Sequence, residues 1–473
     1  MSLYEKLCEY GASQAYPFHM PGHKRQETDF PNPYRIDITE IDGFDNLHHA
    51  EGLLQEAQRE AAALYGVPRA WYLINGSTCG LLAAISAALP KGAEVLVARN
   101  CHKAVYHALQ LRELKPHYIY PELTHLGLQG QVKAEAVERA LEEHPGAKAL
   151  ILTSPTYDGV LSDVEGIAEI LHRRNALLIL DQAHGAHFGL DAVMPESGAR
   201  LGADLVIVSL HKTLPCFTQT ALLLQASDRV AAERLEEYLD IYETSSPSYL
   251  LMAGIEQGLA LVKEEGRQRF AALRERLDRF YERMQGLKYL QVVRPGDFTS
   301  AEAYDFDDSK ILIFPERAGM DGGTLAGRLR RDFGLEVEMT TATYVLALCS
   351  LMDTEEGFRR LAEALEAIDR EAEAQETERR PDHQLPESRR ENERSFEIHE
   401  KEGKFCRLLV PEEAVGETAM DYIYLYPPGI PLVVPGEMIP EWLPGELKRA
   451  QDAGIEINGP AADGMLRVWD RTR

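Results

Sequence analysis

Lys212 stands where a chemically reactive lysine is expected. The apolar run 205–208 is followed at once by Ser209, His211 and Lys212, so a strand-like segment delivers a hydroxyl, an imidazole and an amine to one turn. An ordinary surface lysine would stand in a solvated stretch, but the segment 213–217 that follows is mostly apolar. The hydroxyl and the amine can reach one small anionic ligand, and a lysine amine can form a Schiff base with a carbonyl.

A carboxylate ends a second apolar run of the same kind. Asp181 follows residues 176–180, where an unpaired carboxylate would be costly to bury, so it is hydrogen-bonded, paired or functional. A capping aspartate at a strand end is the plain alternative. A lysine together with an acidic partner for a pyridinium nitrogen indicates a pyridoxal phosphate site, in which the acid keeps the ring nitrogen protonated. His184 comes three residues later and is expected to line the same cavity.

Two further polar turns follow apolar runs. Residues 75–80, with Ser77 and Thr78, combine hydroxyls with a helix start, which suits a phosphate, although Ser and Thr are also ordinary N-cap residues. His102 follows the run 95–97 and is a candidate to lie flat on a cofactor ring, or else simply starts a helix. The segment 153–159 ends another strand at the expected rim of the site.

The elements that must position these residues alternate along the chain. Apolar runs expected to be strands alternate with amphipathic helices, which predicts an α/β fold with a mainly parallel, doubly covered sheet and a ligand beyond the carboxyl ends of the strands. The expected helices begin near 79 and 102 and span 132–143 and 163–174. The expected strands are 71–74, 95–97, 118–120, 149–152, 176–180, 204–208 and 221–225.

Changes in pattern divide the chain into five parts. The expected parts are an N-terminal arm (1–47), a large domain (48–287), a small α+β domain (288–368), a charged connector (369–404) that is solvated or partly disordered, and a C-terminal domain (405–473). The small domain is expected to hold strands near 310–314 and 337–339 and a helix over 323–333. The apolar stripe from Phe270 to Met284 has helical spacing and is expected to be core.

Composition narrows the class of protein. Fifty lysines and arginines stand against 76 aspartates and glutamates, a net charge of −26, which disfavours nucleic acid and anionic membranes as partners and would attract a cationic metabolite. The six cysteines show neither a disulfide framework nor a zinc spacing, and no metal is expected. The start of the chain lacks a signal pattern, and no apolar run approaches the ~18 residues of a membrane span, so a cytoplasmic location is expected.

Taken together, the motifs resemble the bacterial ornithine/lysine/arginine decarboxylase family of fold-type I pyridoxal phosphate enzymes. The resemblance implies a large domain with a mainly parallel sheet, a small α+β domain and a C-terminal domain. It also implies a short, biosynthetic form without a response-regulator-like N-terminal domain, and hence not the ring-shaped decamers of the larger members. The motifs stand in the family's order at 21–24, 75–78, 99–103, 155–157, 181–185, 209–212 and 426–437.

The resemblance also implies roles for single residues. Lys212 would form the Schiff base, Asp181 would pair with the pyridinium, and Glu437 would contact the distal cation of the substrate. The arm that carries His23 would cross to a second subunit, which implies a homodimer with interfacial active sites. The remaining cofactor contacts would be His102 stacked on the ring, His184 beside it, and Ser77, Thr78 and Ser209 on the phosphate.

The implied activity is α-decarboxylation of a basic L-amino acid to its amine and CO₂, as in polyamine biosynthesis. Arginine is favoured over lysine and ornithine because a planar guanidinium suits a bidentate carboxylate such as Glu437. Either Lys212 or His211 would return a proton to the α-carbon. An aminotransferase or a carbon–sulfur lyase is the alternative, since the same sheet, lysine and aspartate serve both. A non-enzymatic scaffold is disfavoured because Lys212, Asp181 and His102 are all present.

Overall fold

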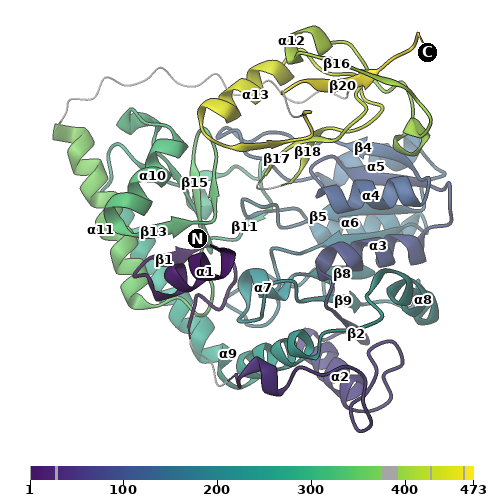
Figure 1. Ribbon diagram of the computed structural model, residues 1–473, viewed down its shortest axis with the longest axis horizontal. Helices are drawn as coiled ribbons and strands as arrows, with labels where there is room; N and C mark the ends of the chain where they lie inside the picture. The colour runs from purple at the N-terminus through teal and green to yellow at the C-terminus, as the bar shows by residue number, and fades with distance from the viewer. Residues whose placement is uncertain (1, 27–29, 375–391, 427–428, 462–463, 473) are drawn as a thin grey trace.

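The computed structural model describes residues 2–26, 30–374, 392–426, 429–461 and 464–472. A large sheet with its helices stands beside a smaller α+β unit, and the C-terminal segment, yellow in Figure 1, lies over both. None of the helices in the described ranges combines the length and the apolar character needed to cross a membrane.

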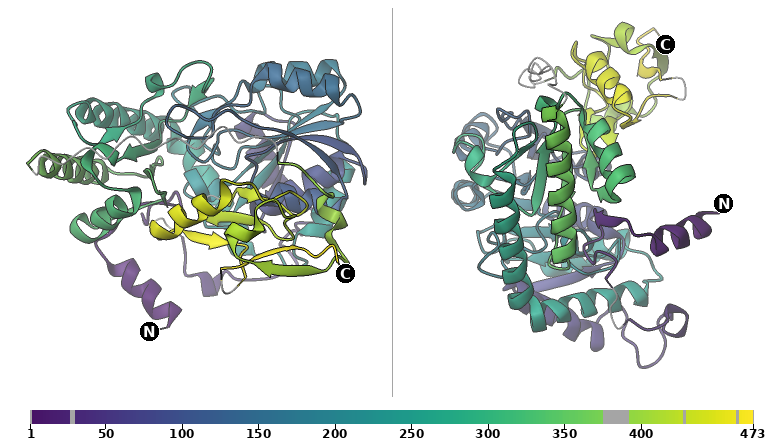
Figure 2. Two further views of the ribbon diagram at one scale, coloured as in Figure 1. Left: turned by 90° about the horizontal axis from the view of Figure 1, so that it is seen from above. Right: turned by 90° about the vertical axis from the view of Figure 1, so that its left-hand side faces the viewer.

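A seven-stranded sheet forms the centre of the larger unit, in the order β2-β9-β8-β7-β5-β3-β4. Five neighbouring strands, from β8 to β4, run parallel, and β9 and β2 are antiparallel to their neighbours. All residues of β8 and β9 are buried, as expected for strands covered on both faces, and helices lie on both sides in Figure 2. The predicted doubly covered, mainly parallel sheet is confirmed. Its strands are β2 (Arg69–Leu73), β3 (Glu94–Ala98), β4 (Lys115–Ile119), β5 (Ala149–Thr153), β7 (Leu177–Asp181), β8 (Leu205–Val208) and β9 (Ala221–Gln225).

The helices of this unit connect the strands close to the predicted positions. The largest difference is at α3, which begins at Gly76 rather than near Cys79, because Gly76 at φ +74° takes a left-handed turn that glycine adopts readily. Helix α2 ends at Tyr65, and its C-cap Gly66 also lies in the left-handed region. The helices are α2 (Leu53–Tyr65), α3 (Gly76–Ala88), α4 (Lys103–Leu111), α5 (Ala134–Glu143), α6 (Val164–Arg173), α7 (Leu210–Thr213) and α8 (Ala232–Tyr242).

The smaller unit contains an antiparallel sheet in the order β10-β12-β15-β14. The N-terminal arm joins it, because β1 (Tyr16–Phe18) pairs in parallel with β13 (Leu335–Val337), and Tyr16 and Phe18 are buried in its core. Helix α1 (Leu3–Ala12) has no buried residue. A short pair, β6 (Val160–Leu161) with β11 (Asp305–Phe306), ties the two units together. The other elements are β10 (Gln291–Val292), β12 (Lys310–Phe314), β14 (Met339–Thr340), β15 (Val345–Leu348), α10 (Gly322–Phe333) and α11 (Glu355–Ala374).

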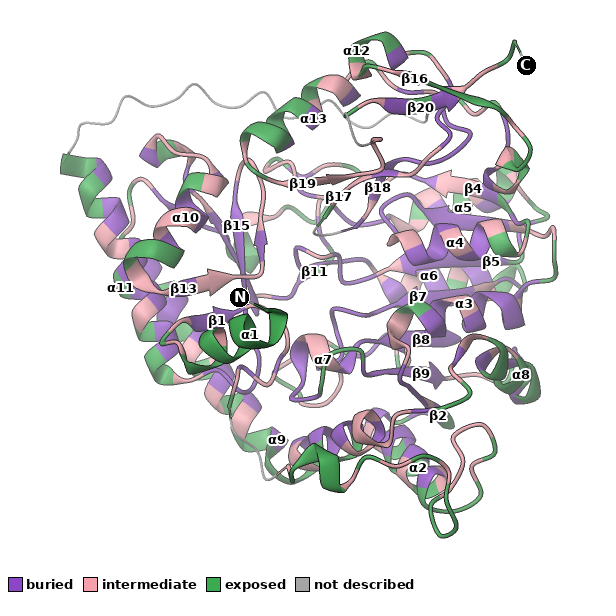
Figure 3. Cartoon of the chain, in the orientation of Figure 1, coloured by how far each residue is buried: buried purple, intermediate pink, exposed green. Residues whose placement is uncertain are grey.

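One long helix, α9 (Tyr249–Met284), belongs to two hydrophobic cores. Its first part places Met252 and Ile255 in the core of the large sheet, and its last part places Leu277 and Phe280 in the core of the smaller unit. The apolar stripe predicted from Phe270 to Met284 is therefore core, as expected. In Figure 3 the buried faces of this helix and of the central strands are purple.

The charged segment predicted as a connector differs from that expectation at both ends. Its first residues continue α11 to Ala374, and residues 375–391 lie outside the described part of the chain. Residues 392–404 pack on the large unit: Ile398, in the 3₁₀ turn 398–401, is buried in the main hydrophobic core. Phe396 is buried as well, against Trp469, so two apolar side chains hold a segment whose composition is otherwise mostly polar.

The C-terminal segment forms two small sheets with their own core. Strand β16 (Cys406–Leu409) pairs with β20 (Leu466–Trp469), and β17 (Ile423–Tyr426) lies between β18 (Pro431–Val433) and β19 (Glu456–Asn458). Helices α12 (Pro411–Ala414) and α13 (Leu443–Asp452) complete it, and Val433 and Leu443 are fully buried between them. The segment therefore packs around a hydrophobic core of its own.

Candidate active site

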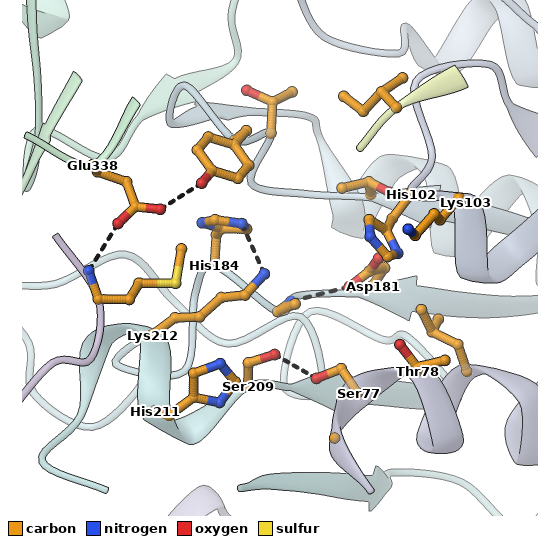
Figure 4. A pocket seen from close by; sticks show the side chains of 18 of the residues that line it. Ser77, Thr78, His102, Lys103, Asp181, His184, Ser209, His211, Lys212 and Glu338 are labelled. Carbon is orange, nitrogen blue, oxygen red and sulfur yellow. Dashed lines mark hydrogen bonds between the residues drawn. The ribbon is translucent and has the colours of Figure 1, made fainter. Parts of the chain in front are cut away.

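A cavity of about 750 Å³ lies at the carboxyl ends of the parallel strands. Its wall contains the polar residues that follow β3, β5, β7 and β8, because parallel strands end at the same edge of a sheet. The sequence-predicted residues at this wall are Ser77, Thr78, His102, Asp181, His184, Ser209, His211 and Lys212. The structure brings all eight together, and Figure 4 shows their side chains around one space.

Lys212 reaches the middle of the cavity from the short helix α7, whose N-cap is Ser209. Its Nζ lies 2.9 Å from Nε2 of His184. Burial lowers the pKa of Lys212, and the nearby carboxylate of Asp181 opposes this shift. Burial and the Lys212 charge together hold the pKa of His184 well below its usual range, so its ring is neutral. A lysine with a depressed pKa has a larger share of neutral amine, which is the nucleophilic form.

Asp181 is the last residue of β7, and its side chain is buried. Its Oδ1 accepts one hydrogen bond, from the backbone N–H of Ala183 at 3.1 Å. Burial raises the pKa of this carboxyl, and Lys212 partly offsets the rise. A carboxylate with spare lone pairs at the wall of a cavity can accept a hydrogen bond from a protonated ring nitrogen.

The first turn of α3 provides an anion site. Asn75 makes no side-chain cap bond to this helix, so the first-turn N–H groups are left to whatever the cavity holds. The Ser77 and Ser209 hydroxyls are hydrogen-bonded to each other across the floor of the cavity, and Thr78 lies beside them in Figure 4. N–H groups, three hydroxyls and a helix N-terminus together suit a phosphate.

Two histidines frame the cavity as neutral rings. His102 is the N-cap of α4 and its Nδ1 accepts the N–H of Ala104 at 3.2 Å, which leaves the proton on Nε2. Burial, helped by the Lys212 charge, lowers the pKa of His102 to about 3. His211 donates from Nδ1 to the carbonyl of Thr220 at 3.0 Å, and burial lowers its pKa to about 4. Neither ring carries a charge near neutral pH.

Glu437 is the one predicted site residue that is not at the cavity. It is fully buried, and both of its carboxylate oxygens bind the guanidinium of Arg99, at 2.8 and 3.2 Å. It also accepts the N–H of Val434 at 3.1 Å and the side-chain amide of Asn392 at 3.2 Å. The expectation that Glu437 contacts the substrate is corrected, because its charge is already balanced and its oxygens are occupied. Its role in the structure is to fasten the C-terminal segment to the large sheet.

The cavity contains acidic residues that sequence reasoning did not assign. Asp158 stands in the segment 153–159, which was predicted at the rim, yet nothing in that motif marked the carboxylate. Glu338 comes from the smaller unit, between β13 and β14. Its carboxylate accepts the hydroxyl of Tyr157 at 2.5 Å and the N–H of Met20 at 2.8 Å. Only the fold brings the arm, the large sheet and the smaller unit to this point.

The residues present fit pyridoxal phosphate. Lys212 can bind its carbonyl carbon, Asp181 its ring nitrogen, and the α3 turn its phosphate. Two buried polar atoms in the wall, Oδ1 of Asn100 and Nδ1 of His184, have no hydrogen-bond partner within the described residues, which is expected of a site built to hold a polar ligand.

Comparison with known proteins agrees with this architecture. A lysine decarboxylase from Francisella novicida superposes with a TM-score of 0.73 at 19% identity, covering 90% of this chain and 73% of that one. An alanine–glyoxylate aminotransferase from Nostoc sp. superposes with a TM-score of 0.54 at 17% identity, covering 72% of this chain and all of that one. At such identities these structures establish the fold alone, and the predicted fold-type I architecture is confirmed.

Sequence comparison reaches further. Arginine decarboxylase from Bacillus subtilis (strain 168) is 29% identical over 98% of this chain and 97% of that protein. The family model of the Orn/Lys/Arg decarboxylase major domain matches residues 1–310. This range includes all residues that line the cavity except Glu338, Tyr426 and Ile430. The chain belongs to the Orn/Lys/Arg decarboxylase family.

Proposed function

We propose that this protein decarboxylates a basic L-amino acid at its α-carbon, with pyridoxal phosphate as cofactor and arginine ahead of lysine and ornithine as substrate. The observation that carries the proposal is the position of Lys212 and Asp181 at the ends of adjacent parallel strands, facing one cavity. Family membership supports the reaction type, and the 29% identical Bacillus subtilis relative, named arginine decarboxylase, supports the order of substrates. We place this reaction, as an expectation, in polyamine biosynthesis.

The bound cofactor supplies a cationic ring that accepts the electron pair left when CO₂ departs. Asp181 keeps the ring nitrogen protonated, because a buried carboxylate stabilises a proton that it shares with a cationic partner. The neutral imidazole of His102 forms part of the cavity wall and offers a flat surface for the cofactor ring. The hydroxyls of Ser77, Thr78 and Ser209 hold the phosphate, which fixes the position of the ring.

Lys212 is the group best placed to return a proton to the α-carbon. Its Nζ is central in the cavity and shares a hydrogen bond with Nε2 of His184 at 2.9 Å, through which a proton can pass. His211 is less suited to this role: its pKa of about 4 leaves it neutral, and its Nδ1–H is committed to the carbonyl of Thr220. Of the two candidates that the sequence left open, we therefore favour Lys212.

The aminotransferase alternative finds less support. Aminotransferases commonly bind the substrate α-carboxylate with an arginine, and none of the described residues that line the cavity is an arginine. The described lining therefore offers no arginine that would hold the substrate carboxylate as such enzymes do.

We also propose that the chain forms a homodimer with interfacial active sites. Helix α1 exposes Leu3, Tyr4 and Leu7, with 75%, 76% and 59% of their surface open, and none of its residues is buried. The arm that carries this helix lines the cavity with His19 and Met20, so a contact made by the helix would reach the site. The expected location is the cytoplasm, in keeping with six unpaired cysteines. Light scattering of the purified protein tests the dimer.

The activity is tested with purified protein, added pyridoxal phosphate, and L-arginine, L-lysine or L-ornithine in separate reactions. We expect CO₂ release and the matching amine, identified by mass spectrometry, with arginine giving the highest kcat/KM. The Lys212→Ala protein serves as the inactive control. If none of the three amino acids yields CO₂, the proposal is wrong; if a keto acid appears in place of the amine, the aminotransferase reading replaces it.

A further inference from the structure

Two carboxylates of the cavity have no part in the chemistry proposed above. Asp158 follows β5 on the large sheet, and Glu338 lies on the smaller unit. Tyr157 links them, because its hydroxyl donates to Oε1 of Glu338 at 2.5 Å while Asp158 is the next residue in the chain. Both carboxylates therefore line the same cavity.

Asp158 is buried without a counter-charge. Only 7% of its surface is exposed, and burial raises its pKa to about 6, while the hydroxyl of Tyr344, donating at 2.6 Å, opposes the rise. No cation among the described residues pairs with it. Two other buried carboxylates do have a cationic partner: Asp307 is paired with Lys310 at 2.6 Å, and Glu437 with Arg99 at 2.8 Å. An acid that is buried, aimed at a cavity and unpaired is the natural partner of a cation that arrives with the ligand.

The carboxylate of Glu338 is less available than that of Asp158 to bind a cation, but it lies on the side of the cavity away from the cofactor-binding groups. Its oxygens already accept from Tyr157 and from the N–H of Met20. In Figure 4 it lies on the opposite side of the Lys212 amine from Asp181 and His102. The distal end of a long substrate bound at Lys212 must point away from the groups that hold the cofactor, and so toward the side of the cavity on which Glu338 lies.

The other cation at the wall does not compete for this region. Lys103 lies beside His102 in Figure 4, away from Glu338, and donates to the Tyr424 hydroxyl at 3.1 Å. Its ammonium also lies over the Tyr424 ring, 4.7 Å from the centroid, which satisfies much of its charge within the C-terminal segment.

Resting on the proposed function, we propose that Asp158 binds the distal cationic group of the substrate, a guanidinium or an ammonium, and that Glu338 adds negative potential to the same cavity. Asp158 thereby takes the role that the sequence had suggested for Glu437. Tyr344 is a positioning residue, because its hydroxyl fixes one oxygen of the carboxylate and leaves the other to the ligand.

The test compares Asp158→Asn with the wild-type holoenzyme on two substrates of the same shape, L-arginine and L-citrulline. Citrulline replaces the guanidinium with an uncharged urea, so the ratio of their kcat/KM values measures recognition of the charge. The change should reduce that ratio roughly 30-fold or more, since removing one partner of a buried charge pair has at least that effect. Asparagine still accepts the Tyr344 hydrogen bond, so the fold should be kept. Asp228→Asn, on the surface, is the matched control and should leave the ratio unchanged.

A binding measurement separates this inference from the proposed function. Agmatine, the amine expected from arginine, keeps the guanidinium but cannot be decarboxylated, so calorimetry reports its affinity without turnover. We expect its Kd to rise roughly 30-fold or more in Asp158→Asn and several-fold in Tyr344→Phe. If the wild type decarboxylates arginine while both variants keep the wild-type ratio and Kd, the inference is overturned and the proposed function stands. If the wild type decarboxylates none of the basic amino acids, the proposed function falls, and this inference falls with it.

Discussion

Replacing Glu437 with glutamine tests whether this residue fastens the fold or binds substrate. Its carboxylate is fully buried and bonded to Arg99 through both oxygens. Burial alone would lower the pKa of Arg99, but Glu437 raises it well above the usual range, so the guanidinium stays charged. Glutamine keeps the shape of the side chain, removes the negative charge and turns an amide toward a group that only donates. An uncompensated buried charge costs about 3–5 kcal/mol.

This loss should appear in stability and not in substrate affinity. For a cooperative unit of 150–250 residues, 3–5 kcal/mol lowers the thermal midpoint by roughly 6–20 °C. We expect that drop by calorimetry or fluorescence, with an unchanged KM for arginine at temperatures where the variant is folded. Glu417→Gln is the matched control: its partner Arg407, at 2.9 Å, is half exposed, and such pairs contribute about 0.2–1 kcal/mol. A variant with the wild-type midpoint and a KM raised tenfold would refute the reasoning and return Glu437 to the substrate.

Three other changes test the site. In Lys212→Ala, borohydride should no longer attach the cofactor to the protein, which intact-mass measurement would show, and turnover should vanish. The thermal midpoint should stay unchanged or rise, because the substitution removes a partly buried amine. Asp181→Asn should lower kcat by at least about 100-fold with little change in midpoint, because asparagine still accepts the Ala183 N–H; a kcat within a factor of a few of wild type would contradict the assigned role. As the pH falls below about 6, Asp158 gains a proton and loses its negative charge, so kcat/KM for arginine should fall about tenfold per pH unit in the wild type but not in Asp158→Asn; equal pH profiles would rule this out.

The central sheet and most of the site followed from local pattern. Each apolar run was a strand, and each polar residue placed at the end of such a run reached the same cavity, because parallel order forces those ends to one edge. A site residue such as Lys212 can therefore be identified from the residues next to it in the sequence.

The remaining features depend on contacts between distant parts of the chain. Glu437 was assigned to the substrate wrongly because its partner Arg99 lies 338 positions away in the sequence. The local sequence of a glutamate does not show whether its carboxylate pairs with a bound ligand or with an arginine of the same chain. Glu338 could not be placed at the site before β13 was known to pair with β1. Residues 392–404 were predicted to be solvated because two buried apolar side chains, Phe396 and Ile398, carry little weight in a polar composition.

The sharing of helix α9 between two cores has a consequence for cooperativity. Thirty-six residues of α-helix form a rod of about 54 Å, with one half packed under the large sheet and the other in the smaller unit. Neither core can melt without exposing one half of the rod and removing the support of the other. The wall that carries Glu338 is thereby held in register with the strand that carries Asp181, because one continuous helix supports both sides of the cavity.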